Sequence, residues 1–340
     1  MSESKFYHFS ATGLFYGVGT LPEAIAASAE GGFVWFNFYQ PSREELSSLI
    51  DTIGIHPLSV EDCFDENQVP KIEYFTNNTF IIFNAYSYVE KALFIDEINL
   101  FLGKNYLITV SGYNSGIRRP LSGITAIIEN GHSNAKAGPD FLMHIILDYL
   151  VDQKYKAFDD MEDELEAAEE LLIDNVGKFQ PMQLIRMRKS LLALRKSLFY
   201  EREILVKICR KDCPFVTENA VIHYRDVYDH LAKFFELTET FREIETSLME
   251  LYTSLLNNLM TKSSNETNAS VRRLTVITTV FMPLTLIAGI GGMSEWSMMT
   301  GPENWKISYP IFLLAMIVIA GLNFYLIKRL ERKGRSHKDN

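Results

Sequence analysis

The sequence predicts an α+β domain followed by a long helix and two membrane-spanning helices. Two observations lead to this fold class. Four segments rich in aromatic and β-branched residues, which are typical of strands, lie before residue 112, whereas helical periodicity dominates the chain after it. Two apolar runs without a charged residue, 274–293 and 307–327, then lie near the C-terminus.

Composition argues against several classes of protein. A net charge of −10 over 340 residues is the opposite of the basic face that nucleic-acid binding requires. The three cysteines are too few and too unevenly spaced for a disulfide framework. Cys209 and Cys213 lie one helical turn apart and could form half of a zinc site, but no other Cys or His pair has matching spacing, which favours reduced thiols. The N-terminus has no secretory signal, so we expect it to stay in the cytoplasm.

Residues 1–138 are predicted to form a cytoplasmic α/β domain. The expected strands are FVWFNFY, TFIIFNAYSYV, EINLFLG and NYLITVS. Between the first two, Ser42 and Glu45 form a capping-box pattern that predicts a helix start. His56 lies near Glu61 and Asp62, but no nucleophile or nucleotide motif accompanies it, so we expect a structural or capping role. The chain is therefore not expected to be an enzyme.

Residues 139–217 are predicted to form a cytoplasmic pair of helices, over 140–174 and 181–210. The first is acidic and the second basic, which favours antiparallel packing of the two. A run of acids is usually a solvated helix face. A weak divalent-ion site is the less favoured alternative, formed by Asp159, Asp160, Asp163 and Glu166.

Residues 218–270 read as one long stalk helix without Pro or Gly. Its apolar residues recur at steps of three and four, which predicts packing against neighbouring helices. This stripe contains Val227, Leu231, Phe234, Leu237, Phe241, Ile244, Leu248, Leu251, Leu255 and Leu259. The stalk is expected to continue directly into the first membrane helix, so motion in the cytoplasmic part could reach the bilayer.

The two apolar runs predict a membrane hairpin: transmembrane helix 1 over 271–293, an outer loop over 294–306, transmembrane helix 2 over 307–327 and a basic tail over 328–340. Each run is long enough to cross a hydrocarbon core of roughly 30 Å. Basic residues precede the first apolar run and follow the second, whereas the loop between them has a single Lys beside Glu295 and Glu303. The positive-inside rule therefore predicts a multi-pass protein of the cell membrane with both termini cytoplasmic.

Polar and small residues share one face of the first membrane helix. They recur at alternating steps of three and four: Asn268, Val271, Thr275, Thr278, Met282, Thr285 and Gly289. Such a face can line a polar pathway. Thr and Gly are also favoured where helices pack, and Thr can bond its own backbone, so periodicity alone leaves pore lining and packing open. Pro283 lies inside the run and removes one backbone hydrogen bond.

The order of these parts resembles the CorA family of divalent-cation (magnesium and cobalt) transporters. The similarity is carried by SSNETNASVRRLTVITTVFMPLTLIAGIGGM, HPLSVEDCFDENQVPKIEYFTNNTFII and LFLGKNYLITVS, which together span most of the chain. In this family a comparable run ends in Tyr-Gly-Met-Asn at the outer mouth. Gly292 and Met293 match that signature, whereas Ser294 takes the Asn position and Gly291 replaces the aromatic residue.

The resemblance implies a funnel-shaped homopentamer in the lipid bilayer, whose first membrane helix lines a central pore. Gly292, Met293, Ser294 and Glu295 would then form the outer mouth and selectivity region. Asn268 matches an amide near the cytoplasmic end, and further positions match pore-facing ones: Leu274, Met282, Thr285 and Gly289. The likeness thus favours pore lining for the whole stripe, including Val271 and Thr278.

The implied function is Mg²⁺ influx through a channel or transporter, driven by the membrane potential and gated by cytoplasmic Mg²⁺. Mg²⁺ keeps several waters, so Ser294, Asn268 and Glu295 would hold the hydrated ion through its water shell. Because Ser is shorter than Asn, the mouth would be wider than in the family. A Zn²⁺, Co²⁺ or Ni²⁺ transporter on the same scaffold is therefore one alternative. The other is a non-conducting membrane scaffold, in which the polar face of the first membrane helix serves only for packing.

Overall fold

The computed structural model describes residues 4–10, 15–65, 68–113, 120–129, 137–292, 301 and 303–336. The chain divides into two compact units, residues 1–252 and 253–340. The first contains a sheet and its covering helices, and the second contains the end of one long helix and a further helix.

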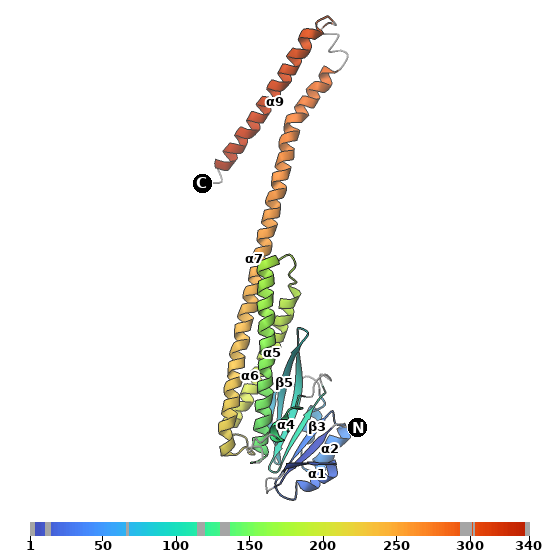
Figure 1. The fold of residues 1–340 in the computed structure, drawn as a ribbon, viewed down its shortest axis with the longest axis vertical. Helices are drawn as coiled ribbons and strands as arrows, with labels where there is room; N and C mark the ends of the chain where they lie inside the picture. Colours follow the sequence, from blue (N-terminus) through green and yellow to red (C-terminus); the bar gives the residue numbers. More distant parts are fainter. Residues whose placement is uncertain are drawn as a thin grey trace. The chain divides into compact units, whose positions relative to one another are not determined.

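A seven-stranded sheet forms the centre of the first unit, in the order β2-β1-β3-β7-β6-β5-β4 (Figure 1). β3 and β7 pair in parallel, and the other neighbours pair antiparallel. The strands are β1 (Lys5–Phe9), β2 (Phe15–Val18), β3 (Phe33–Tyr39), β4 (Lys71–Tyr74), β5 (Asn78–Val89), β6 (Ala92–Gly103) and β7 (Tyr106–Ser111).

Helices cover both faces of this sheet, because successive strand residues point to opposite faces. In β3, Phe36 and Phe38 join the cluster that includes residues of the short helices α1 (Leu21–Ala27), α2 (Arg43–Thr52) and α3 (Pro57–Asp62). Trp35 instead joins the cluster formed with α4 (Ile124–Glu129) and the long helices α5 (Pro139–Asn175), α6 (Met182–Cys209) and α7 (Glu218–Gly291). The unit therefore has three layers with a core on each side of the sheet.

The four strands expected from the sequence are present, and β6 is longer than expected. It begins at Ala92 because a two-residue turn joins it to β5. Glu90 and Lys91 both have positive φ, 52° and 63°, as the type I′ hairpin turn that suits strand twist requires. β1, β2 and β4 were not predicted from the sequence; they are short and pair toward the two ends of the sheet.

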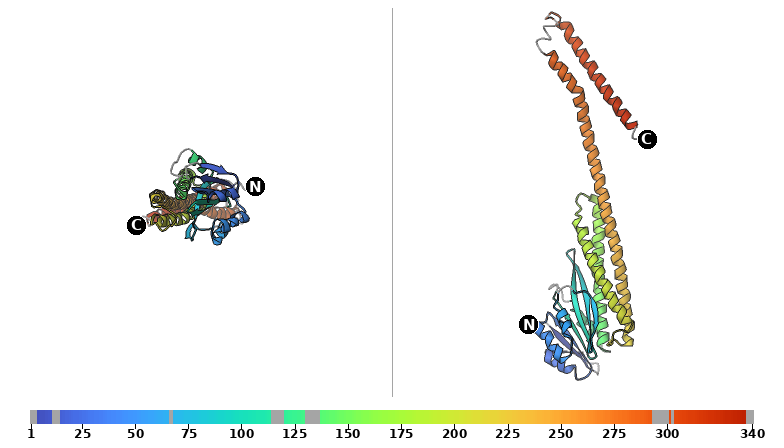
Figure 2. Two further views of the ribbon diagram at one scale, coloured as in Figure 1. Left: turned by 90° about the horizontal axis from the view of Figure 1, so that it is seen from below. Right: turned by 180° about the vertical axis from the view of Figure 1, so that it is seen from behind.

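Three long helices lie side by side in the first unit (Figure 2). They are α5 (Pro139–Asn175), α6 (Met182–Cys209) and α7 (Glu218–Gly291), of which α7 continues into the second unit. α5 and α6 run antiparallel, as predicted, and buried apolar side chains hold them together, including Phe158 and Leu191. The ion pair of Arg195 on α6 is made with Glu239 on α7, so the acidic run of α5 is not its partner.

The buried stripe of α7 differs in part from the predicted one. Val227, Leu231, Phe234, Phe241 and Leu248 are buried, as predicted. Thr238 and Glu245 are also buried, whereas Ile244 is 37% exposed and Leu259, beyond the sheet-bearing unit, is 47% exposed. Periodicity places neighbours on one face, but it does not decide which of two adjacent positions points at the next helix; here the Thr238 hydroxyl donates to the Phe234 carbonyl at 2.8 Å.

A charged network lies within the core between β5, α5 and α6. Lys154 is fully buried, and its Nζ donates to the Asn84 carbonyl at 2.6 Å and lies 3.1 Å from Glu201 Oε2. Glu201 also accepts from the Asn84 amide and the Tyr86 hydroxyl. Burial lowers the pKa of Lys154 and raises the pKa of Glu201, and the attraction between the two opposes both shifts.

Local expectations for the N-terminal residues are confirmed. Ser42 and Glu45 form a reciprocal capping box at α2. His56 is the N-cap of α3: its Nδ1 accepts from the Leu58 amide at 3.2 Å, and its ring stacks on Phe75. Cys63, Cys209 and Cys213 form no disulfide, and Cys63 and Cys213 are buried.

The second unit contains the C-terminal part of α7 and the helix α9 (Trp305–Ser336). Each contains a stretch long and apolar enough to cross a membrane, and no part of either stretch is buried within the single chain. The two helices approach closely at Gly291, where an added Cβ would lie 2.6 Å from the Phe312 ring. An aromatic side chain at this position would therefore clash with α9.

Candidate ion pathway and metal site

The predicted pore-lining residues all lie on α7, which is continuous through them. Asn268, Val271, Leu274, Thr278, Met282, Thr285 and Gly289 are in this one helix, and all are exposed in the single chain. An added Cβ at Gly289 would meet no atom within 4 Å. This face is thus available to water, lipid or other copies of the chain.

The threonine hydroxyls on this face bond to their own helix. Thr278 Oγ1 donates to the Leu274 carbonyl at 2.8 Å, and Thr285 Oγ1 donates to the Phe281 carbonyl at 2.9 Å. This bonding uses the single hydroxyl proton and leaves acceptor lone pairs on each oxygen. The oxygens can therefore accept from the water shell of a cation while the helix stays intact.

A shallow groove of about 650 Å³ runs along α7 around Pro283 and is lined by residues of that helix alone: Ile277, Thr278, Phe281, Met282, Thr285, Leu286, Gly289 and Ile290. Thr278 and Thr285 supply its hydroxyls, and the rest of the lining is apolar. Such a surface offers weak contacts to a hydrated ion rather than ligands that would strip its water.

The helix ends where the predicted outer mouth begins. The Gly292 amide donates to the Ala288 carbonyl at 3.0 Å in the last turn of α7. Met293, Ser294 and Glu295 lie outside the described residues, so their predicted roles stay predictions.

Three ligand side chains that the sequence did not single out converge in the first unit. Asp148 and Asp152 on α5 and His230 on α7 have ligand atoms that all lie within 4.8 Å of one another. The carboxyl of Asp152 has a raised pKa, caused first by burial and then by Asp148. Nδ1 of His230 is buried without a hydrogen-bond partner. Two carboxylates and one imidazole can together hold a divalent cation.

A sequence signal for this cluster was present. Asp148 and Asp152 lie four residues apart, on one face of an otherwise apolar stretch, ILDYLVDQ. The third ligand, His230, comes from a helix more than 70 residues later, so only the packing of α5 against α7 could join them.

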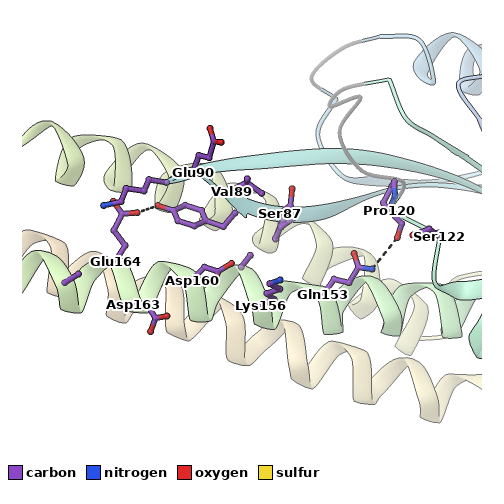
Figure 3. Close-up of a pocket in the computed structure, with 15 residues that line it drawn as sticks. Ser87, Val89, Glu90, Pro120, Ser122, Gln153, Lys156, Asp160, Asp163 and Glu164 are labelled. Carbon is purple, nitrogen blue, oxygen red and sulfur yellow. Dashed lines mark hydrogen bonds between the residues drawn. The ribbon is translucent and has the colours of Figure 1, made fainter.

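The acids that the sequence did single out are arranged differently. Asp160 and Asp163 line a cleft of about 960 Å³ between α5 and the β5–β6 hairpin, together with Lys156 (Figure 3). The neighbouring Glu164 accepts from the Tyr88 hydroxyl at 2.5 Å. The described residues do not bring Asp159, Asp160, Asp163 and Glu166 together as metal ligands, which favours the solvated face.

Comparison with known protein families assigns the chain to one of them. The model of the CorA-like Mg²⁺ transporter protein family matches residues 30–329. The chain belongs to this family. The family is described as one of transporters, which is consistent with the prediction that the chain is not an enzyme.

Relatives support the same assignment. The cobalt/magnesium transport protein CorA of Thermotoga maritima is 32% identical over 299 residues, covering 87% of this chain and 82% of that protein. The cobalt/magnesium transport protein CorA of Methanocaldococcus jannaschii is 26% identical, covering 87% and 90%. The complete structure of the CorA magnesium transporter from the latter organism has a TM-score of 0.69 at 24% identity and covers 96% of this chain and 97% of that one. The predicted CorA fold is confirmed.

Proposed function

We propose that this protein is a divalent-cation channel or transporter that carries Mg²⁺ into the cell. Membership of the CorA-like Mg²⁺ transporter family is the main support. The uncharged stretch of α7 with its hydroxyl-bearing face provides a surface suited to a hydrated cation.

The ion pathway would follow one face of α7 in a homopentamer within the cell membrane, with both termini cytoplasmic. Ser294 with Gly292 and Met293 would hold the hydrated ion at the outer mouth, and Glu295 would concentrate cations there. The Thr278 and Thr285 hydroxyls and the Asn268 amide would pass it inward through water. Rings of Leu274 and Met282 would form apolar constrictions that close by dewetting; Val271 and Gly289 complete this face.

The membrane potential can supply the driving force without a nucleotide. An elementary charge that moves into an interior-negative cell gains about 2.3 kcal/mol per 100 mV, so a divalent ion gains about 4.6 kcal/mol. Coordination through water needs no full dehydration, which Mg²⁺ resists. The expected transport is therefore electrogenic influx.

Cytoplasmic Mg²⁺ would regulate this influx at Asp148, Asp152 and His230. These side chains join α5 to α7, and α7 is the helix that continues into the pathway. A cation bound here would stabilise one arrangement of the two helices. Unlike the fully buried Glu201, these side chains can be reached by an ion from water, because Asp152 is exposed and Asp148 and His230 are half-buried.

Co²⁺ is the second cargo that we propose, because the relatives in Thermotoga maritima and Methanocaldococcus jannaschii carry cobalt in their names. Zn²⁺ and Ni²⁺ remain alternatives that the Ser294 mouth leaves open. The absence of His and Cys from residues 268–296 argues mildly against a pathway that strips softer metals of their water.

The deciding experiment is metal uptake into sealed proteoliposomes that hold an interior-negative potential. Mg²⁺, Co²⁺, Ni²⁺ and Zn²⁺ would be compared for the native chain and for Ser294→Asn. Mg²⁺ flux through the native chain supports the proposal. Flux of Mg²⁺ only through Ser294→Asn would mean that the native mouth serves another ion, and no flux of any metal from an intact oligomer would favour the non-conducting scaffold.

A further inference from the structure

A strip of possible metal ligands follows the seam between α5 and α7. The helices run in the same direction, because Asp140 at the start of α5 bonds to Thr217 and Tyr224 near the start of α7. On α5, ligand side chains recur every four residues at positions 144, 148 and 152; on α7 they lie at 223, 226 and 230. The end nearer the start of the two helices carries two histidines, whereas the other end holds Asp148, Asp152 and His230.

The two histidines, His144 and His223, face each other across the seam. Their ring centroids are 5.2 Å apart with an interplanar angle of 52°. His144 also packs edge-on against Tyr224, and His223 packs against Phe141, both at 5.6 Å. Tyr224 is fully buried and its hydroxyl donates to the Asp140 carbonyl at 2.6 Å. Both histidine rings are therefore packed against side chains of the protein, and the hydroxyl of one of these, Tyr224, is itself fixed by a hydrogen bond.

His144 is half-buried, and its ring lies against the ring of His223. Burial, and secondly His223, lower the pKa of His144 to about 4.

We propose that His144 and His223 form a second metal site, which binds a transition-metal dication such as Ni²⁺, Co²⁺ or Zn²⁺ in preference to Mg²⁺. Imidazole nitrogen suits these metals, whereas Mg²⁺ favours oxygen ligands. Both residues are half-buried, so water can complete the coordination shell. The site would join α5 to α7 independently of the Asp148, Asp152 and His230 cluster, and it does not rest on the proposed transport.

The test is calorimetric titration of the full-length protein in detergent with Ni²⁺, in the presence of saturating Mg²⁺ that occupies oxygen-rich sites. The native protein is expected to retain a Ni²⁺-binding event. His144→Gln and His223→Gln should each weaken that event at least about tenfold, the lower end of the effect of losing even an outer partner of a ligand. The control His56→Gln changes a histidine at the N-cap of α3, outside both clusters, and should leave the event unchanged.

Two outcomes would overturn the site: unchanged Ni²⁺ binding in both His144→Gln and His223→Gln, or loss of the event in His230→Gln alone.

A second measurement needs no variant. Carbethoxylation of His144 and His223 in the native protein, read by mass spectrometry, should be slowed by Ni²⁺ and not by Mg²⁺; equal rates with and without Ni²⁺ would refute the proposal. Neither readout involves ion flux, so failure here would leave the proposed transport standing.

Discussion

Two exposed isoleucines illustrate how differently the two units treat apolar surface. Ile173 on α5 is 67% exposed and Ile317 on α9 is 70% exposed. Around Ile173, buried side chains of the same helix, such as Leu172 and Ala168, pack into the core of the first unit. In the second unit, none of the described side chains from residue 253 onward is buried in the single chain.

The difference is one of solvent. In the first unit exposed apolar residues lie on helices that also bury apolar side chains in a core, and some exposed apolar surface is normal for a folded protein. In the second unit exposed apolar residues are the rule, and such a surface needs lipid or other copies of the chain. Equal exposure in a single chain therefore has opposite meanings, and the following changes would sharpen or break this contrast.

The largest effect is expected in the core of the first unit, at the buried charge pair. Lys154→Met leaves the Glu201 carboxylate in an apolar core with no cation, and breaking a buried pair in this way costs about 3–5 kcal/mol. The free energy of unfolding, measured by denaturant titration of the purified protein, should fall by this amount.

The control for the charge pair is the double variant Lys154→Met/Glu201→Leu, which removes both charges. It should regain most of the loss, since apolar replacement of a whole buried pair is often neutral. A single variant as stable as the native protein would mean that the pair is not buried in the folded state.

The two isoleucines provide the direct comparison. Ile317→Lys places a charge within the apolar stretch of α9 and should cost about 2.5–3.5 kcal/mol of membrane insertion. Ile173→Lys should change the free energy of unfolding by no more than about 0.5 kcal/mol. Membrane integration is measured by alkaline extraction, and stability by thermal unfolding. A large cost for Ile173→Lys would instead indicate that another molecule covers α5.

Glu97 on β6 tests burial of a charge at the edge of the core. Burial raises its pKa to about 7, against a hydrogen bond from Asn99 that lowers it. Because the folded-state pKa lies above the unfolded one, the folded state binds more protons between these values, and stability is lost as pH rises through about 7.

Glu97→Gln should accordingly raise the free energy of unfolding by about 1–2 kcal/mol above pH 7, after allowance for partial solvent screening. Below pH 4.5, the ordinary pKa of a glutamate carboxyl, the native and variant proteins should be nearly equal. Thermal unfolding across this pH range measures the difference, and a gain that does not depend on pH would exclude ionisation as its cause.

Apart from Ile173→Lys, the smallest effect is expected at the N-cap of α3. His56→Ala removes the acceptor for the Leu58 amide and the stacking on Phe75, and loss of a cap typically costs about 1 kcal/mol. His56→Asn, which keeps a capping acceptor, should recover part of this loss. Equal thermal stability of His56→Ala and the native protein would remove the capping role.

Local patterns in the sequence predicted the elements whose residues interact with near neighbours. The capping box of Ser42 and Glu45, the start of α7 at Glu218 and the two apolar stretches depend on spacing within a few turns. The short strands β1, β2 and β4 were missed because four or five residues carry too little periodicity. Their pairing partners lie elsewhere in the sheet and only the assembled sheet identifies them.

The candidate sites divide in the same way. The face of α7 from Asn268 to Gly289 was visible as helical spacing because all its members share one helix. The cluster of Asp148, Asp152 and His230 was not, since it needs α5 beside α7. Likewise, nothing local indicated that Phe312 would occupy the space beside Gly291.

The sequence by itself indicated the fold family through motifs that resemble those of CorA proteins. It also determined the two apolar stretches and the polar face of the first, because composition and periodicity act over short distances along the chain. The tertiary structure decided which charges are buried, which acids meet as ligands and which histidines face each other. These outcomes depend on contacts between segments tens of residues apart, and such contacts form only when burial of apolar surface brings α5, α6, α7 and the sheet together.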